Sequence, residues 1–145
     1  MRTATFGLTV VLVCVDAFAQ NTTPQWKVVK AIQVVQGTAQ VPITNLFTPT
    51  ASGPYRFTGY IACNSTTTDL NASWDLNLYW NDSTGTSQFS FAFCDFIQGE
   101  QSGTVGPLPF TPQPGVPVQF QIQQNGSPPP LGSTYTFWFT IEHLE

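Results

Sequence analysis

The sequence contains very little charge, and this shortage excludes several classes of function. Only four of its 145 residues are Lys or Arg and eight are Asp or Glu, which gives a formal net charge of −4. Nucleic-acid binding needs clustered Lys and Arg side chains that neutralise phosphates, and a helix lying on a membrane surface needs a basic face. Neither pattern occurs. We therefore expect no nucleic-acid partner and a surface of neutral Ser, Thr, Asn and Gln side chains.

Residues suited to catalysis are also scarce. His143 is the only histidine and lies two residues from the end of the sequence, so we expect it at the end of a strand rather than in a serine triad. The acidic residues show no spacing that singles out a pair of carboxylates for glycoside hydrolysis. There is no glycine-rich phosphate loop and no zinc-ligand spacing. The sequence predicts a protein that is not an enzyme and has neither a cofactor nor a metal site.

One long apolar run is present, near the N-terminus. Arg2 precedes this run at residues 6–15, and "AFA" at 17–19 supplies the small residues that a signal peptidase reads. The run is shorter than the about 18 residues that a membrane-spanning helix needs, and Asp16 interrupts the apolar character. We predict a signal peptide at residues 1–19 and a single domain at 20–145. That domain is expected to be secreted, extracellular or at the cell surface, with no membrane segment after cleavage.

Three cysteines are present, and the signal peptide would remove Cys14. The remaining pair, Cys63 and Cys94, predicts one disulfide in an oxidising compartment. Their positions in the alternating pattern disagree, because Cys63 is in phase with the apolar residues of its strand and Cys94 is out of phase with the neighbouring phenylalanines. A β-bulge near Ala92 would reconcile the two.

Alternation of apolar and polar residues predicts an all-β protein, and no helical periodicity follows the signal peptide. The expected strands are residues 25–36, 39–47, 55–63, 73–80, 88–94, 116–124 and 134–144. The turn at 81–87 contains Gly85 and should close a hairpin. The Gly- and Pro-rich region 98–115 is expected to be a long connection with one weakly marked strand. Seven or eight short strands indicate an antiparallel two-sheet β-sandwich or a barrel.

Four stretches resemble a known family. They are "GPYRFTGYIACN" at 53–64, "LNLYWND" at 76–82, "GVPVQFQI" at 115–122 and "YTFWFTIEHLE" at 135–145. In their aromatic and turn positions they are similar to the jelly-roll domains of the C1q and tumour-necrosis-factor type found in phages and bacteria. The resemblance covers about residues 40–145. It implies a ten-stranded jelly roll, often trimeric, that serves assembly or binding rather than catalysis. The two cysteines and the low charge depart from this pattern and leave the trimer open.

The stretch "SWDLNLYWND" at 73–82 divides into two faces. Its even-numbered residues from Trp74 to Trp80 are large and apolar and are expected in the core. Its odd-numbered residues from Asp75 to Asn81 are expected on a solvated face. Asp75 and Asn81 are roughly 20 Å apart along a strand, so this row cannot by itself supply the six or more oxygens that calcium needs.

Three aromatic residues, Tyr60, Tyr79 and Trp138, are expected to point outward. Beside amide side chains such rings can stack on a saccharide. Alternatively, a neighbouring subunit or a loop covers them, and we favour this interpretation because exposed aromatic patches usually mark protein interfaces.

The segment 27–35 carries apolar residues on both sides of the expected strand. Val28, Ile32 and Val34 are on one side, and Val29, Ala31 and Val35 are on the other. One side can face the core of the domain, and the other then needs a partner. We therefore predict a structural module that forms a homo-oligomer, either a trimer or a filament. The alternative is a carbohydrate-binding, lectin-like module with a glycan as its partner.

Five asparagines precede x-Ser or x-Thr and are candidate N-glycosylation sites. They are Asn21, Asn64, Asn71, Asn81 and Asn125. Because Asn, Ser and Thr all favour turns, the pattern predicts a glycoprotein only if the host carries out N-glycosylation.

Overall fold

The computed structural model describes residues 23–65, 69–96, 99–126 and 132–145, and the elements in these ranges are eight β-strands. The strands are β1 (Trp26–Gly37), β2 (Val41–Phe47), β3 (Tyr55–Ser65), β4 (Asp69–Asp82), β5 (Gly85–Phe96), β6 (Gly99–Phe110), β7 (Val118–Asn125) and β8 (Thr134–Leu144). No helix in these ranges has the length and apolar character needed to cross a membrane. The predicted signal peptide lies outside the described residues.

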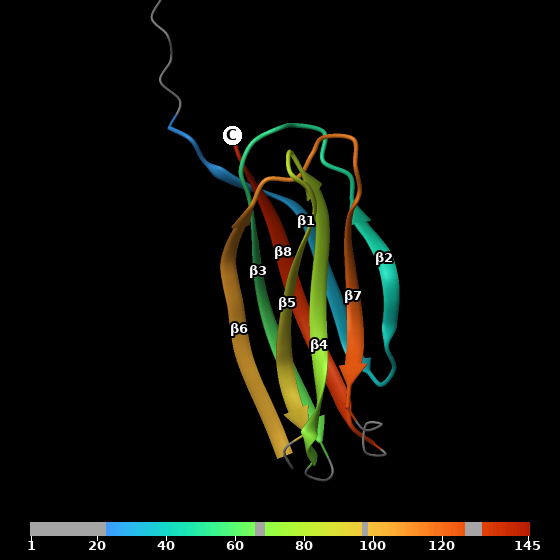
Figure 1. The fold of residues 1–145 in the computed structure, drawn as a ribbon. Helices are drawn as coiled ribbons and strands as arrows, with labels where there is room; N and C mark the ends of the chain where they lie inside the picture. The colour runs from blue at the N-terminus through green and yellow to red at the C-terminus, as the bar shows by residue number, and fades with distance from the viewer. Residues whose placement is uncertain (1–22, 66–68, 97–98, 127–131) are drawn as a thin grey trace, which may run out of the picture.

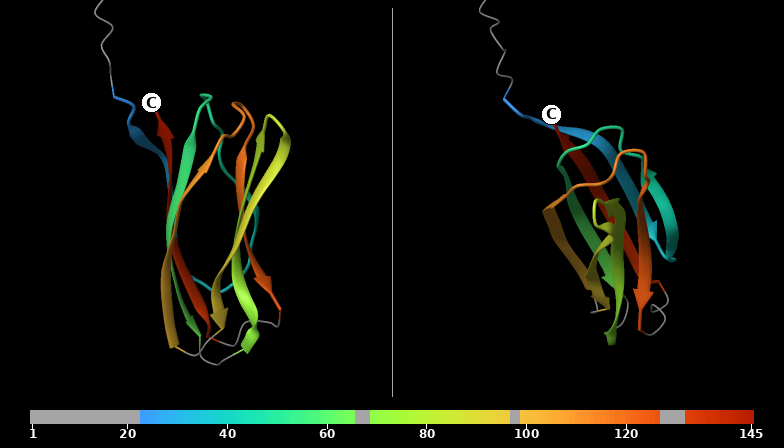
Figure 2. Two further views of the ribbon diagram at one scale, coloured as in Figure 1. Left: turned by 60° about the vertical axis from the view of Figure 1, so that its left-hand side comes forward. Right: turned by 45° about the horizontal axis from the view of Figure 1, so that its top comes forward.

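The strands form two antiparallel sheets packed face to face (Figure 1; Figure 2). Sheet A has the order β1-β8-β3-β6, and sheet B has the order β2-β7-β4-β5. Every connection except the one from β4 to β5 passes from one sheet to the other, and this arrangement of eight strands is a jelly roll. The predicted fold class is therefore confirmed, although the described residues form eight strands and not the ten that the resemblance implied.

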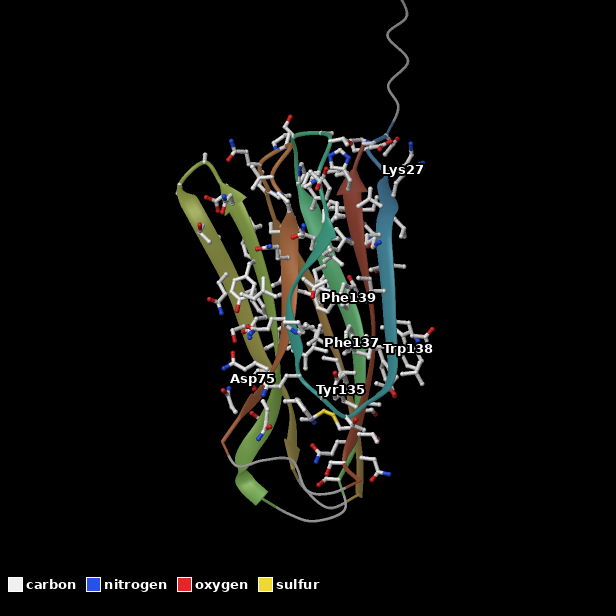
Figure 3. The ribbon with its side chains drawn as sticks, turned by 90° about the vertical axis from the view of Figure 1, so that its right-hand side faces the viewer. Lys27, Asp75, Tyr135, Phe137, Trp138 and Phe139 are labelled. Atoms are coloured by element: carbon white, nitrogen blue, oxygen red, sulfur yellow. A yellow bond between two sulfur atoms is a disulfide. The ribbon has the colours of Figure 1, made fainter. Side chains whose placement is uncertain are left out.

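The core lies between the sheets and follows the alternation of the sequence. In β8 the core side carries Tyr135, Phe137, Phe139 and Ile141, all buried. Figure 3 shows Phe137 and Phe139 pointing toward the opposite sheet, whereas Trp138 points away from it. Burying side chains of this size contributes roughly 1.5–3 kcal/mol each. The strands predicted at residues 55–63 and 134–144 are confirmed, and both alternate between buried and more exposed residues.

The predicted hairpin between β4 and β5 is confirmed, and Asp82 holds its turn. Asp82 pairs with Gly85 across the turn, and Gly85 has a positive φ of 126°. The Asp82 carboxylate accepts hydrogen bonds from Ser87 Oγ at 2.6 Å, Thr84 Oγ1 at 2.6 Å and the Thr84 amide at 2.8 Å. The hydrogen bonds from Ser87 and Thr84 lower the pKa of Asp82 to about 2.

Acid is expected to destabilise the fold through this turn and through the Arg56–Glu142 pair. The pKa of Asp82 is lowered from 3.8, and hydrogen bonds from Arg56 lower the pKa of Glu142 below 4.5. Groups whose pKa is depressed by folding contribute stability above their unfolded pKa and lose it as the pH falls. The free energy of unfolding should thus be level above about pH 5 and fall between about pH 4.5 and 2.

Urea unfolding across this pH range tests the expectation. Asp82→Asn should be less stable than the wild type at pH 7 and should lose less stability on acidification, because residue 82 no longer titrates. Parallel losses in the two proteins between pH 4.5 and 2 would contradict a role for Asp82.

β6 confirms the weakly marked strand predicted within region 98–115 and corrects the expectation that most of this region is a connection. Residues 99–110 are a strand that pairs with β3 from Tyr55↔Phe110 to Ser65↔Gly99. Among the side chains of β6 that the structure describes, Phe110 alone is buried, and Val105 and Leu108 are partly buried against the core. β6 lies at an edge of sheet A, where Gly and Pro are tolerated and fewer apolar residues are needed. The weak alternation therefore reflects its edge position and not a loop.

β1 carries a bulge that changes which way its first residues face. Its register with β8 shifts between Val28 and Lys30, which makes Val29 the extra residue. Val28 consequently faces outward and is 60% exposed, while Ile32 and Val34 pack against the core. The prediction that Val28 shares a side with Ile32 and Val34 is wrong, because alternation continues only where the register is unbroken.

Candidate binding faces

The outer face of sheet A presents a stacked pair of exposed aromatic rings. Tyr60 of β3 and Trp138 of β8 are directly opposite each other in the strand register. Their ring centroids are 5.3 Å apart with an interplanar angle of 28°, and the residues are 37% and 42% exposed. Val28 and Val35 of β1 are exposed on this side too, at 60% and 58%. We call Val28, Val35, Tyr60 and Trp138 the aromatic face.

A groove lies beside Tyr60 on the same outer surface. Its volume is about 490 Å³, and strands β3, β6 and β8 supply its walls. The lining side chains are neutral and mostly polar, among them Asn64, Gln101, Ser102 and Thr136. The groove therefore offers hydrogen-bonding groups next to an aromatic ring, and no charged group lies among its lining residues.

Ion pairs lie at one end of sheet A, near the chain ends. Arg56 donates two hydrogen bonds to Glu142, at 2.6 and 3.0 Å, and its guanidinium lies 4.5 Å from the centre of the Trp26 ring. Lys27 forms an ion pair with Glu145, and this hydrogen bond lowers the pKa of Glu145. The charges thus neutralise one another at the end of the sheet and leave the centre of the aromatic face uncharged.

The outer face of sheet B has a different character, because side-chain amides join its strands. Gln88 Nε2 donates to Asn77 Oδ1 at 3.3 Å, and Asn77 Nδ2 donates to Gln121 Oε1 at 3.4 Å. The Tyr79 hydroxyl also donates to Gln121 Oε1, at 2.8 Å. These bonds connect β5, β4 and β7, and we call Asn77, Tyr79, Gln88 and Gln121 the amide network.

The prediction of a solvated row on β4 is wrong for two of its residues. Asp75 is 8% exposed and Asn77 is 4% exposed, although both face away from the core. Their polar atoms are satisfied within the sheet, since Ser73 Oγ and Asn125 Nδ2 donate to the Asp75 carboxylate and Asn77 belongs to the amide network. Buried polar groups of this kind are tolerated when they are hydrogen-bonded.

The predicted aromatic residues do not form one site. Tyr60 and Trp138 lie together on sheet A, whereas Tyr79 lies on sheet B. Figure 3 shows the two surfaces on opposite sides of the molecule, with Trp138 projecting from one and Asp75 lying on the other. The sequence predicted that each ring faces outward, but it could not show that two of them stack.

Three glycosylation candidates have described side chains. Asn64 is exposed and lines the sheet A groove. Asn81 is partly buried on sheet B, and Asn125 is exposed but donates its amide to Asp75. Asn21 and the side chain of Asn71 lie outside the described residues.

His143 is buried and packs against Tyr55. Their ring centroids are 4.4 Å apart, and His143 Nε2 lies 3.2 Å from the Ser52 carbonyl oxygen. Glu145 lies 3.7 Å from Nδ1. These contacts close one end of the sandwich. Across the described ranges, no three or more His, Cys, Asp or Glu residues are grouped so that they could hold a metal ion.

The predicted disulfide is present. Cys63 of β3 and Cys94 of β5 are bonded across the two sheets, with their Cα atoms 6.1 Å apart. The register of β4 and β5 pairs Trp74 with Cys94 but Asp75 with Ala92, so one extra residue separates Cys94 from Ala92. This is the bulge that brings Cys94 onto the core side.

Comparison of the chain with models of known protein families, with curated proteins and with solved structures finds no match. Function must therefore be inferred from the two outer faces of the molecule.

The amide network is the feature that sequence reasoning missed. Its members are ordinary polar residues of the expected strands, and their contacts depend on which strands are neighbours. The one available signal was the run of alternating glutamines at 119, 121 and 123, which places amides on one face of a strand.

Proposed function

We propose that the chain is a secreted, non-enzymatic structural module that self-associates through the aromatic face of sheet A. The observation that carries this proposal is the exposed Tyr60–Trp138 stack. Interface cores are enriched in aromatic residues and depleted in charge, and exposed apolar patches mark interaction sites. The centre of the aromatic face has both properties.

The low net charge of the protein also favours association with a second copy of the same chain. A net charge of −4 on a chain of this size gives little repulsion between copies. The charged residues near the aromatic face, such as Arg56 and Glu142, are already paired with each other. A second copy of the same chain is therefore the occupant that this face suits best.

The outer face of sheet A suits self-association better than the free edge of β1 does. Bulges interrupt β1 at Val29 and between Val34 and Gly37, and Lys27 and Lys30 lie on the strand. Bulges and lysines are features that discourage strand pairing at an edge. The contact between faces gives a closed oligomer such as a trimer if the rotation between copies closes, and a filament if it does not.

Secretion and glycosylation are parts of the same proposal. The Cys63–Cys94 disulfide is consistent with export to an oxidising compartment. A glycan on Asn64 would stand on the outer surface of sheet A and obstruct association, whereas glycans on Asn81 or Asn125 would stand on sheet B. Assembly is therefore expected to tolerate a glycan on Asn125 better than one on Asn64.

Light scattering on the mature protein tests self-association. The double variant Tyr60→Ser/Trp138→Ser should shift the protein toward the monomer, because aromatic hot spots cost at least about 2 kcal/mol each, or roughly 30-fold in the dissociation constant. Ile43→Ser is the matched control, since Ile43 is an exposed apolar residue on β2 of the other sheet.

The control should retain the assembly of the wild type. Circular dichroism establishes that each variant is folded before its mass is measured. A wild-type protein that is monomeric at millimolar concentration contradicts the proposal, as does equal dissociation by Ile43→Ser.

A further inference from the structure

A small cleft opens on the outer face of sheet B beside the amide network. Its volume is about 130 Å³, and it lies among β4, β5 and the beginning of β7. Its lining residues include Tyr79, Trp80, Asn81, Thr86, Val116, Pro117 and Gln119. The lining thus combines two aromatic residues, two amides and a hydroxyl with Val116 and Pro117, and no charged residue is among the residues that line it. We refer to it as the Tyr79 cleft.

Hydrogen bonds fix the polar groups next to this cleft before any ligand arrives. Gln121 Oε1 accepts from both Tyr79 and Asn77, and Gln119 Nε2 donates to Asn45 Oδ1 at 2.9 Å. The Tyr79 ring is therefore held by its hydroxyl, and the amides of Gln119 and Gln121 are held in defined orientations on their strand. Groups that are ordered in advance lose less conformational entropy on binding.

The chemistry of the face decides which ligand fits. The carboxylate of Asp75 is buried and bonded to Ser73 and Asn125, and no charged residue is among those that line the cleft, so the cleft offers no open charge to an ionic ligand. Large exposed apolar residues gather on the β1 side of sheet A, and Ile43 at the edge strand β2 is the exception among the described residues. Trp80, Val116 and Pro117 give the cleft a small apolar part beside its polar groups, which suits a ligand that has both characters.

We propose that the Tyr79 cleft binds a neutral saccharide. Such a ligand presents many hydroxyl groups that both donate and accept, which matches amide side chains, and the apolar face of its ring can stack on an aromatic side chain. The small volume limits the cleft to part of one sugar ring, and adjoining rings would lie over the amide network. The inference does not rest on the proposed self-association, since the two surfaces belong to opposite sheets and can be occupied together.

Isothermal titration with neutral hexasaccharides of glucose, xylose and mannose tests this site. The protein comes from a host without N-glycosylation, because a glycan on Asn81 would fill the cleft. Tyr79→Ser should weaken binding at least about tenfold, the order expected for loss of a stacked aromatic contact. Tyr79→Phe keeps the ring but loses the bond to Gln121, and it should weaken binding only a few-fold.

Val29→Ser is the control, because it changes an exposed residue of β1 on the opposite sheet that belongs to neither proposed surface. It should leave saccharide binding unchanged. The inference is overturned if no probe binds at millimolar concentration, if hexagalacturonate binds more tightly than the neutral probes, or if Tyr79→Ser binds the neutral probes as tightly as the wild type. Light scattering on the same variants reports separately on self-association, so the failure of one proposal is distinguishable from the failure of the other.

Discussion

Replacing Phe137 with alanine is expected to lower the free energy of unfolding by about 3–5 kcal/mol. Phe137 is buried in β8, at the middle of sheet A. Its ring lies 5.3 Å from that of Phe139 and 6.2 Å from those of Tyr135 and Phe120. Phe120 belongs to sheet B, so the truncation removes contacts within one sheet and between the two.

Trp138→Ala provides the comparison, because Trp138 is the next residue of the same strand but faces outward. It loses its stack with Tyr60 and little burial, so the expected cost in the monomer is below about 1.5 kcal/mol. Urea unfolding at low protein concentration measures both variants. Equal costs at residues 137 and 138 would show that the alternation of β8 does not define the core.

The alternation of the sequence predicted the core well where strands are central and unbroken. β3 and β8 lie inside sheet A, and each has a neighbour on both sides. Their inward residues must fill the space between two sheets, so they are large and apolar at every second position. This requirement leaves a clear period of two in the sequence. It also explains why the outward facing of Tyr60 and Trp138 could be predicted.

Edge strands and bulges were predicted poorly, for physical reasons. β6 needs few apolar residues because one of its sides is unpaired, and its glycines and prolines suggest a loop. A bulge inserts one residue and reverses the facing of everything beyond it. The bulge in β1 reverses the direction in which the Val28 side chain faces, and no residue near it in the sequence marks its position. The bulge near Ala92 was predictable only because Cys94 had to reach Cys63.

The candidate faces were partly predictable. The period of a strand shows which of its residues point outward. The order of the strands in the sheet decides which of those residues touch. The sequence placed Asp75 and Asn77 on the outside and so suggested exposure. In the folded sheet β7 and β5 flank β4, and their side chains cover both residues. Outward facing on a central strand is thus compatible with burial when neighbouring side chains are long and hydrogen-bonded.

Removing the disulfide by Cys63→Ala/Cys94→Ala is expected to lower the free energy of unfolding by about 4 kcal/mol. The two cysteines are 31 residues apart in the sequence, and closing a loop of this length restricts the unfolded chain by that amount in the chain-entropy model. The bond joins β3 of sheet A to β5 of sheet B, which share no backbone ladder. The link therefore adds a covalent bond between two layers that otherwise meet through side-chain packing and the segments that connect their strands.

Reductant separates the effect of the bond from the effect of the substitutions. The unfolding free energy of the wild type under reducing conditions should approach that of the double variant, because both then lack the constraint on the unfolded chain. Reductant should leave the double variant unchanged. Titration of free thiols in the unfolded, non-reduced protein should find neither Cys63 nor Cys94 reactive. Two reactive thiols, together with a wild type that reductant does not destabilise, would show that packing alone joins the sheets.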